Sequence, residues 1–322
     1  MKSTRRGPQA PADARAVEKE RRDRGTDRRD DVKRRRVEMM LDQFFRPVRW
    51  ATRVLDTLGL QSGRPMQVDR QQVGAARRAG ARPLRVAFAS DFHAGATTAD
   101  RVLVEACAAL DALEPDVLLL GGDFVSVRAD DIHALAPLLA SVRAPFGKFG
   151  VYGNHDLRAN RPVIAEAMAA AGVRMLVNEV VQLPAPHDDV NIIGLDDPIR
   201  GTPRGELLDA VDGVRVLLMH APDGLLAAGD RHFDVALCGH THGGQIVLPG
   251  GVMPYLPHGA LSRTFPVGVF QLEPDGNRTL LVSRGVGCST LPVRFGSPAE
   301  VHEITVGAGR NEIDYVGHSL LN

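Results

Sequence analysis

Five apolar segments of this chain each run directly into a short group of Asp, Asn or His residues. Apolar runs of about four to eight residues are typical of buried strands, and ligands of helix-covered sheets bind where the carboxyl ends of the strands meet. We therefore expect the five groups to share one site. The groups are Asp91-Phe92-His93, Gly121-Gly122-Asp123, Gly153-Asn154-His155-Asp156, Met219-His220 and Gly239-His240-Thr241-His242.

The segments around these groups alternate between strand and helix patterns. Helices are expected over residues 99–113, 132–142 and 162–171, with a helical turn over 206–210. Strands are expected over residues 84–90, 117–120, 148–152, 175–177, 180–183, 191–194, 214–219, 234–237, 267–272, 279–283 and 301–306. Alternation followed by a strand-rich C-terminal part predicts an α/β fold in which two sheets pack between helices.

The N-terminal region differs in composition from the rest of the chain. Residues 1–60 hold 17 Lys and Arg against 10 Asp and Glu, about +7, although the whole chain has a formal net charge of zero. Residues 1–36 contain almost no large apolar side chains, so we expect them to be a disordered charged leader. Residues 61–82 are predicted to be a linker, residues 83–310 the main folded domain and residues 311–322 a tail.

Residues 37–60 have the apolar spacing of an amphipathic helix. Pro47 predicts a bend or a break next to Arg46. Basic residues flank the segment and Trp50 lies within it, a combination that suits peripheral contact with an anionic membrane surface. Packing against the main domain, or a contact between two copies of the chain, would suit the same pattern, and the sequence leaves these alternatives open.

Cysteine usage and hydropathy indicate a compartment. The three cysteines, Cys107, Cys238 and Cys288, are too few and too widely spaced for a disulfide framework, which favours a reducing environment. No apolar run approaches the roughly 20 residues that span a bilayer, and no apolar segment follows Arg5-Arg6 as an export signal would require. We therefore expect a cytoplasmic protein with peripheral contact at the inner membrane.

The residue types at the five strand ends suit a metal centre. Asp91 and His93 are two residues apart, so both side chains can point the same way, and the last group repeats this spacing. The Asp123 carboxylate could bridge two cations, while Asn154 would add a neutral oxygen. A site of two metals about 3.5–4 Å apart can clamp the attacking and leaving oxygens of an in-line phosphoryl displacement. Mixed imidazole and carboxylate ligands suit manganese, iron or zinc.

Other residues near these groups are candidates for catalysis and substrate binding. His155 adjoins a candidate ligand, and the following Asp156 could orient its ring by a hydrogen bond, so His155 is a candidate to protonate a leaving oxygen. Arg158, Arg284 and Arg294 could each bind phosphate oxygens bidentately. Surface ion pairing is the alternative for each arginine.

The order Asp-x-His, Gly-Asp, Gly-Asn-His-Asp, His, Gly-His-x-His resembles the calcineurin-like metallophosphoesterase superfamily over residues 84–306. The resemblance implies a four-layer αββα sandwich with two mixed sheets. It assigns one metal to Asp91, His93, Asp123 and His242, and a second metal to Asp123, Asn154, His220 and His240. The runs 239–246, 283–287 and 292–294 are similar to a bacterial branch that contains membrane-associated or exported phosphodiesterases and UDP-2,3-diacylglucosamine pyrophosphatases.

The resemblance implies a hydrolase that uses two divalent ions (Mn, Fe or Zn) to cleave a phosphodiester or pyrophosphate. Attack would be in line by a metal-bridging hydroxide, with His155 assisting the leaving group, and the phosphoester substrate could be lipid-linked or nucleotide-linked. A nuclease or phosphomonoesterase of the same superfamily is an alternative, and a noncatalytic metal-binding scaffold is another. We expect no specific nucleic-acid partner, because acidic residues dilute the basic leader and no aromatic stacking platform is visible.

Overall fold

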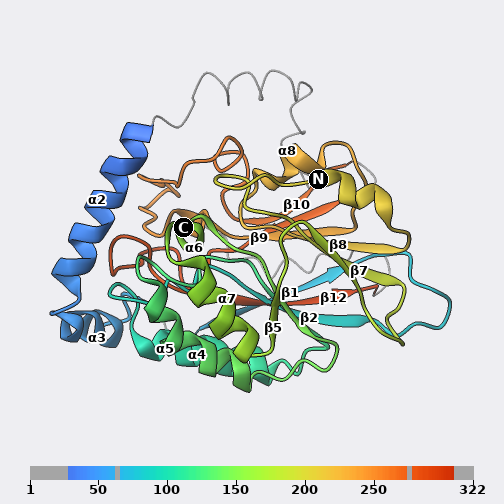
Figure 1. Cartoon of the computed structure of the whole chain (residues 1–322), viewed down its shortest axis with the longest axis horizontal. Helices are drawn as coiled ribbons and strands as arrows, with labels where there is room; N and C mark the ends of the chain where they lie inside the picture. Colours follow the sequence, from blue (N-terminus) through green and yellow to red (C-terminus); the bar gives the residue numbers. More distant parts are fainter. Residues whose placement is uncertain (1–27, 62–65, 274–277, 308–322) are drawn as a thin grey trace.

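The computed structural model describes residues 28–61, 66–273 and 278–307. Two six-stranded sheets lie face to face, with helices on the outside (Figure 1). The first sheet has the order β1 (Gln67–Val73), β12 (Glu300–Val306), β2 (Leu84–Ala89), β3 (Val117–Leu120), β4 (Lys148–Gly150), β5 (Val173–Met175). The second has the order β10 (Gly268–Gln271), β11 (Thr279–Val282), β9 (Val235–Cys238), β8 (Val214–Leu218), β7 (Val190–Gly194), β6 (Glu179–Gln182).

Both sheets are mixed. Strands β2 to β5 pair in parallel, whereas β12 runs antiparallel to β2 and parallel to β1. In the second sheet β7, β8, β9 and β11 are parallel, and β6 and β10 pair antiparallel at the edges. The parallel centres of the two sheets place the carboxyl ends of β2, β3, β4, β8 and β9 at one edge of the sandwich.

Three apolar layers hold the sandwich together. The layer between the sheets is built from alternate strand residues such as Phe88, Leu119, Ile192, Leu218 and Leu237. Helices α4 (Asp100–Ala112), α5 (Ile132–Ser141) and α7 (Arg161–Ala170) pack on the outer face of the first sheet (Figure 1). The outer face of the second sheet is covered by shorter elements: η2 (Gly205–Ala210), α8 (Gly224–Ala228) and residues 261–265. The expected αββα arrangement is confirmed, with a thin outer layer on the second sheet.

Several short elements were not predicted. Strand β1 lies inside the expected linker 61–82, because its alternating polar residues give no apolar signal and backbone pairing with β12 holds it at the sheet edge. The turns η1 (Ala129–Asp131) and η3 (His242–Gly244) and the helix α6 (Asn154–Arg158) have three to five residues, too few for a periodic pattern.

The N-terminal segment forms two helices, α2 (Arg28–Phe45) and α3 (Arg49–Thr57), which meet at the expected break beside Pro47. Helix α2 includes residues 28–36, which we had expected to be disordered; residues 1–27 of that leader and the tail 311–322 lie outside the described residues. Within the described ranges, no helix combines the length and the apolar character needed to cross a bilayer.

Candidate metal centre

The seven predicted metal ligands come together where the carboxyl ends of the two sheets meet. They follow strands β2, β3 and β4 of the first sheet and β8 and β9 of the second. None of them is more than 5% exposed: Asp91, His93, Asp123, Asn154, His220, His240 and His242. Buried polar groups at this density require partners or a cation, since burying an unpaired polar or charged group is costly.

Asp91, His93 and His242 form a first ligand group. The Nε2 atoms of His93 and His242 are 3.0 Å apart, and Nε2 of His242 is 3.5 Å from Oδ1 of Asp91. Oδ2 of Asp91 accepts a hydrogen bond from the Ser90 hydroxyl, whereas Oδ1 is buried and has no hydrogen-bond partner among the described residues. A buried, unpartnered carboxylate oxygen facing two imidazole nitrogens fits a cation ligand set.

His220, Asn154, His240 and Asp123 form a second ligand group. Nε2 of His220 lies 3.1 Å from Oδ1 of Asn154, 3.2 Å from Nδ1 of His240 and 3.3 Å from Oδ2 of Asp123. The other ring nitrogens of the two histidines donate to backbone carbonyls at 2.8 and 3.0 Å. These outer hydrogen bonds fix the rings, so that Nε2 of His220 and Nδ1 of His240 present their lone pairs to the group.

Asp123 stands between the two groups. Its Oδ2 atom is 3.6 Å from Nε2 of His93 and 3.3 Å from Nε2 of His220. Its Oδ1 atom accepts a hydrogen bond of 2.8 Å from the backbone N–H of His155. One carboxylate oxygen therefore faces imidazoles of both ligand groups, while the other anchors the side chain.

The backbone of the ligand loops is strained. Five ligands have φ in the left-handed region, which costs a residue with a side chain about 1–3 kcal/mol: Asp91 (54°), His93 (45°), Asp123 (53°), His240 (71°) and His242 (54°). Backbone hydrogen bonds between neighbouring loops hold this conformation, such as Asp91 N–H to the Gly122 carbonyl at 2.9 Å. Strain of this kind gathers at functional sites, where surrounding structure fixes it.

Two glycines allow the ligand loops to approach each other. A Cβ atom on Gly239 would lie 2.0 Å from Oδ2 of Asp91, and one on Gly153 would lie 2.2 Å from Oδ1 of Asp123. Both distances are far inside van der Waals contact, so any side chain at these positions would displace a ligand carboxylate. The glycines that precede the predicted ligands are thus part of the site.

Burial and mutual charge set the protonation of the ligands. Burial lowers the pKa of His93 and His242 well below the ordinary value, and lowers that of His240 to about 4, so these rings are neutral and keep a lone pair for a cation. Burial opposes the ionisation of both Asp123 and His220, but their mutual attraction outweighs it: the pKa of Asp123 is lowered well below its usual range and that of His220 is raised. A cation bound at Nε2 of His220 would displace the proton from that atom, because a ligating imidazole must be neutral. The donor set fits divalent cations.

His155 lies beside the ligands on α6, and its orientation differs from our expectation. Its Nδ1 atom lies 2.7 Å from the carbonyl oxygen of Ser126, to which it donates. The expected partner, Asp156, instead accepts from the backbone N–H groups of Phe124 at 2.9 Å and of Gly153 at 2.9 Å. The prediction that Asp156 orients the His155 ring is wrong, because this carboxylate is directed at the β3 and β4 loops; it supports the loop that carries Asp123.

The three arginines considered for phosphate binding have protein partners. Arg158 forms an ion pair of 2.8 Å with Glu38 of α2, and Arg284 pairs with Glu300. Arg294 is 3% exposed. Its guanidinium donates to the carbonyls of residues 284, 287 and 297 and lies 3.3 Å from Nδ1 of His242. Arg294 alone of the three has a printed contact with a ligand, and the phosphate contacts of all three remain predictions.

The sequence analysis did not identify three groups at the centre, two backbone carbonyls and one carboxyl group. The carbonyls of Ser126 and His258 position His155 and His240, and no sequence signal marks a carbonyl. Asp197 is fully buried after β7, and burial raises its pKa to about 6 although His220 opposes the shift. The rule that found the ligands, polar residues directly after an apolar strand, also applies to Asp197.

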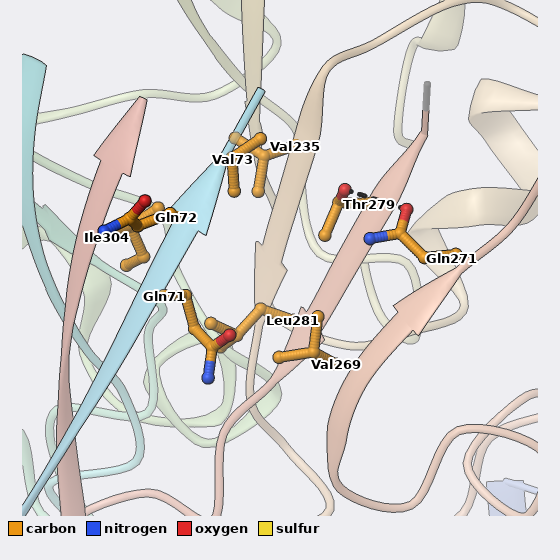
Figure 2. A pocket seen from close by; sticks show the side chains of 9 residues that line it. All are labelled: Gln71, Gln72, Val73, Val235, Val269, Gln271, Thr279, Leu281 and Ile304. Carbon is orange, nitrogen blue, oxygen red and sulfur yellow. Dashed lines mark hydrogen bonds between the residues drawn. The ribbon is translucent and has the colours of Figure 1, made fainter. Parts of the chain in front are cut away.

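The hollow between the edges of the two sheets is separate from this centre. Figure 2 shows it among β1, β12, β9, β10 and β11, lined by side chains such as Gln71, Val73, Leu281 and Ile304. Its volume is ≈ 10 Å³, about the space of a single water molecule, and none of the predicted ligands lines it. It does not compete with the metal centre as a functional site.

Comparison with known proteins places this geometry in a family. The family described as "Calcineurin-like phosphoesterase" matches residues 84–244, the part of the chain that carries all seven ligands. The chain is 34% identical over 201 residues to the uncharacterized metallophosphoesterase YkuE of Bacillus subtilis (strain 168), covering 60% of this chain and 68% of that protein.

Two further relatives have names that state an activity. The phosphodiesterase YaeI of Escherichia coli (strain K12) is 29% identical over 215 residues, covering 64% of this chain and 76% of that protein. The UDP-2,3-diacylglucosamine pyrophosphatase LpxG of Chlamydia trachomatis (serovar D) is 27% identical over 273 residues, covering 68% of this chain and 82% of that protein.

Proposed function

Since the chain belongs to the calcineurin-like phosphoesterase family and is a metal-dependent phosphoester hydrolase, we propose that it cleaves a phosphodiester or pyrophosphate at two divalent ions. One ion would bind the group of Asp91, His93 and His242, and the other the group of Asn154, His220 and His240, with Asp123 shared. The observation that supports this most strongly is that Oδ2 of Asp123 faces imidazoles of both groups, at 3.6 and 3.3 Å.

The bound ions, the ligand residues and His155 would each have a separate role in the reaction. Bound divalent ions would polarise phosphoryl oxygens and lower the pKa of a water molecule. The chain supplies the buried ligand cage, in which hydrogen bonds to backbone carbonyls hold the His220 and His240 rings. His155 is held by the Ser126 carbonyl through Nδ1, so its Nε2 atom is the one available to give a proton to the leaving oxygen. A water molecule attacks phosphorus and loses one proton, the opposite phosphorus–oxygen bond breaks, and the leaving oxygen takes a proton from Nε2 of the doubly protonated His155 ring, which the proton lost by the water replaces.

Metal content measured together with turnover tests this proposal. Purified full-length protein equilibrated with excess manganese should hold two ions per chain and hydrolyse bis-p-nitrophenyl phosphate in a manganese-dependent way. One ion per chain at full activity would contradict the shared role of Asp123. Absence of manganese-dependent hydrolysis from a protein that holds two ions would contradict the reaction.

Helices α2 and α3 support a second proposal, contact of residues 37–60 with an anionic membrane surface. The segment docks on the main domain through its acidic residues, which form the ion pairs Glu38–Arg158 at 2.8 Å, Asp42–Arg128 at 2.9 Å and Asp56–Arg101 at 2.5 Å. These contacts match one of the alternatives that the sequence left open, packing against the domain. They also turn the acidic side chains inward.

The outward face of the same helices is apolar and basic. Phe44 is 64% exposed and Trp50 66% exposed, and Val37, Met40, Val54 and Leu58 are exposed beside them. Arg36 and Arg53 are exposed on this segment as well. Exposed apolar patches of this kind mark interaction sites, and a helix face that combines aromatic and basic residues suits the headgroup region of an anionic bilayer.

A membrane surface near the active centre would bring the enzyme to a lipid-linked phosphoester. The likeness to LpxG, named as a UDP-2,3-diacylglucosamine pyrophosphatase, supports a lipid-linked substrate. Each basic residue near an anionic surface contributes about 1 kcal/mol, and salt screens this attraction. We therefore propose weak, salt-sensitive and reversible binding.

A further inference from the structure

Two loops beside the metal centre carry exposed apolar side chains, one loop after η3 and the other after β11. Their exposed fractions lie between 44% and 57%, and the residues are Leu248, Val252, Tyr255, Leu291 and Phe295. Apart from Val104, every other large apolar side chain that is exposed in the part of the chain that the structure describes lies within residues 37–58. We call residues 248–255 and 291–295 the loop surface.

Hydrogen bonds connect the loop surface to the end of α3. The backbone N–H of Val247 donates to the carbonyl of Phe295 at 2.7 Å, which joins the two loops. The backbone N–H of Arg294 donates to the carbonyl of Leu60 at 2.6 Å, which joins the second loop to the segment after α3. Leu58 of that segment is 66% exposed. The loop surface therefore adjoins the exposed apolar face of residues 37–60.

The same two loops hold two of the metal ligands. The carbonyl of His258, at the end of the first loop, lies 3.0 Å from Nε2 of His240 and accepts from it. The hydroxyl of Ser297, just after the second part of the loop surface, donates to the carbonyl of His242 at 2.8 Å. A partner of the loop surface would therefore contact the loops that fix one ligand of each group.

The tip of the first loop is a tight turn that faces open space. The backbone N–H of Leu248 donates to the carbonyl of Val252 at 2.8 Å, and that of Gly251 donates to the carbonyl of Leu248 at 3.1 Å. Gly250 and Gly251 have φ of 83° and 76°, and a Cβ atom at either position would meet nothing within 4 Å. The apolar side chains beside this turn are thus presented to a partner outside the described chain.

The charges of these loops indicate an anionic lipid surface as that partner. Residues 235–272 and 276–299 contain no Asp or Glu, whereas the whole chain contains 39. Arg263 of the first stretch is exposed, and the carboxylate of Asp56 on α3 is directed to Arg101 at 2.5 Å. An anionic bilayer repels carboxylates and takes up apolar side chains, so it accounts for both properties of the loop surface. Contact between two copies of the chain would account for the apolar side chains alone.

Resting on the proposed membrane contact of residues 37–60, we infer that the loop surface contacts the same anionic bilayer. The apolar side chains of both loops enter the headgroup region next to Leu58, and the loops that hold His240 and His242 lie against the lipid. The inference deepens the proposed function, because a phosphoester that is anchored in the bilayer meets the protein at the loops that hold its metal ligands.

Tryptophan fluorescence can locate the contact, because Trp50 is the only Trp of the chain. Three full-length proteins with one Trp each are compared: wild type, Trp50→Phe with Val252→Trp, and Trp50→Phe with Val104→Trp on α4. All three positions are exposed. Vesicles of phosphatidylglycerol and brominated phosphatidylcholine at low salt should quench the fluorescence of the first two proteins, relative to vesicles without bromine, and should leave that of the third unchanged.

The outcomes separate the loop contact from the proposed function. Quenching of Trp50 without quenching at position 252 would overturn the loop contact and leave the membrane contact of residues 37–60 standing. Absence of quenching at both positions would overturn both contacts. Equal quenching at position 104 would show adsorption without a preferred face and would overturn the loop contact as well. Manganese-dependent hydrolysis of bis-p-nitrophenyl phosphate by the same proteins, without vesicles, checks folding and tests the proposed reaction independently.

A carboxylate in the first loop tests how much the loop surface contributes to binding. Val252→Asp should lower the partition coefficient of the full-length protein into the same vesicles by about tenfold, because the variant loses apolar burial and gains repulsion. Val104→Asp should leave it unchanged. Both variants should keep the wild-type unfolding temperature. If Val252→Asp binds vesicles as wild type does, the inference is overturned. A dimer in wild-type solutions that Val252→Asp alone dissociates, with vesicle binding unchanged, would assign the surface to a second copy instead.

Discussion

Replacing His155 by Ala separates proton donation from metal binding. The backbone N–H of residue 155, which holds Oδ1 of Asp123 at 2.8 Å, is retained in the variant, so the shared carboxylate should keep its position. The side chain contributes to the site through its ring, whose Nδ1 atom is fixed 2.7 Å from the Ser126 carbonyl. We therefore expect His155→Ala to keep close to two manganese ions per chain.

The loss in turnover should depend on the leaving group. General acid assistance is worth about 10²–10⁴-fold, which corresponds to about 3–5 kcal/mol in the barrier. A nitrophenolate leaves readily without a proton, whereas an alkoxide does not. The variant should therefore lose the full factor of about 10²–10⁴ in kcat on alkyl diesters, and much less on p-nitrophenyl esters.

Paired measurements make this prediction decisive. Turnover of wild-type and variant protein on alkyl and p-nitrophenyl diesters is compared with metal content from elemental analysis of the same samples. His187→Ala is a matched control, since His187 is also fully buried but lies away from the centre beside Phe146. An equal defect on all leaving groups would refute proton donation and leave stabilisation of transition-state charge as the role of the ring.

Three further predictions concern the shared ligand, the helix face and pH. Asp123→Asn preserves the shape of the side chain but removes its charge, so manganese content should fall below one ion per chain and turnover should fall by about 10³-fold or more. The buried control Asp116→Asn should keep both the metal content and the turnover. Unchanged metal content in Asp123→Asn would contradict the shared role of this ligand. Phe44→Ser should weaken sedimentation of the protein with anionic liposomes at low salt. Val104→Ser, a change at an exposed position of α4, should not weaken it. Equal binding of the two variants would contradict membrane contact through the exposed face of α2. The pKa of His302 is raised to about 9 because the attraction of two carboxylates outweighs burial. The stability that this protonated ring contributes is therefore complete below the pKa of an unfolded histidine, about 6.5, and is lost as the pH rises through 9. Denaturant unfolding between these pH values should show a steeper loss of stability in wild type than in His302→Gln.

The sequence predicted which polar side chains come together, because the signal that marks them is local. Each ligand directly follows an apolar strand, so strand prediction and residue type together were enough to bring Asp91, Asp123 and His220 to one edge. The fold class followed from the same alternation. Strand β1 could not be predicted in this way, because its stability comes from pairing with β12, which lies more than 200 residues further along the chain.

Charged side chains were harder to assign because their partners are distant in sequence. Arg158 and Glu38 are separated by 120 residues, and nothing in either local pattern indicates the pair. Asp156 follows His155, yet the short helix α6 directs its carboxylate to the backbone of the β3 loop. Sequence adjacency therefore gave the wrong partner, whereas the tertiary fold determines which donor a buried carboxylate meets.

Helix α2 links three properties that the sequence presented separately. Glu38 and Asp42 face inward and bind arginines of the main domain, Leu41 lines the hollow beside His155, and Phe44 is exposed. A helix turns about 100° per residue, so one short segment can present all three faces. If the outward face contacts a bilayer, the inward face would still hold the main domain through the ion pairs of Glu38 and Asp42, so that the segment would join the domain to the lipid surface.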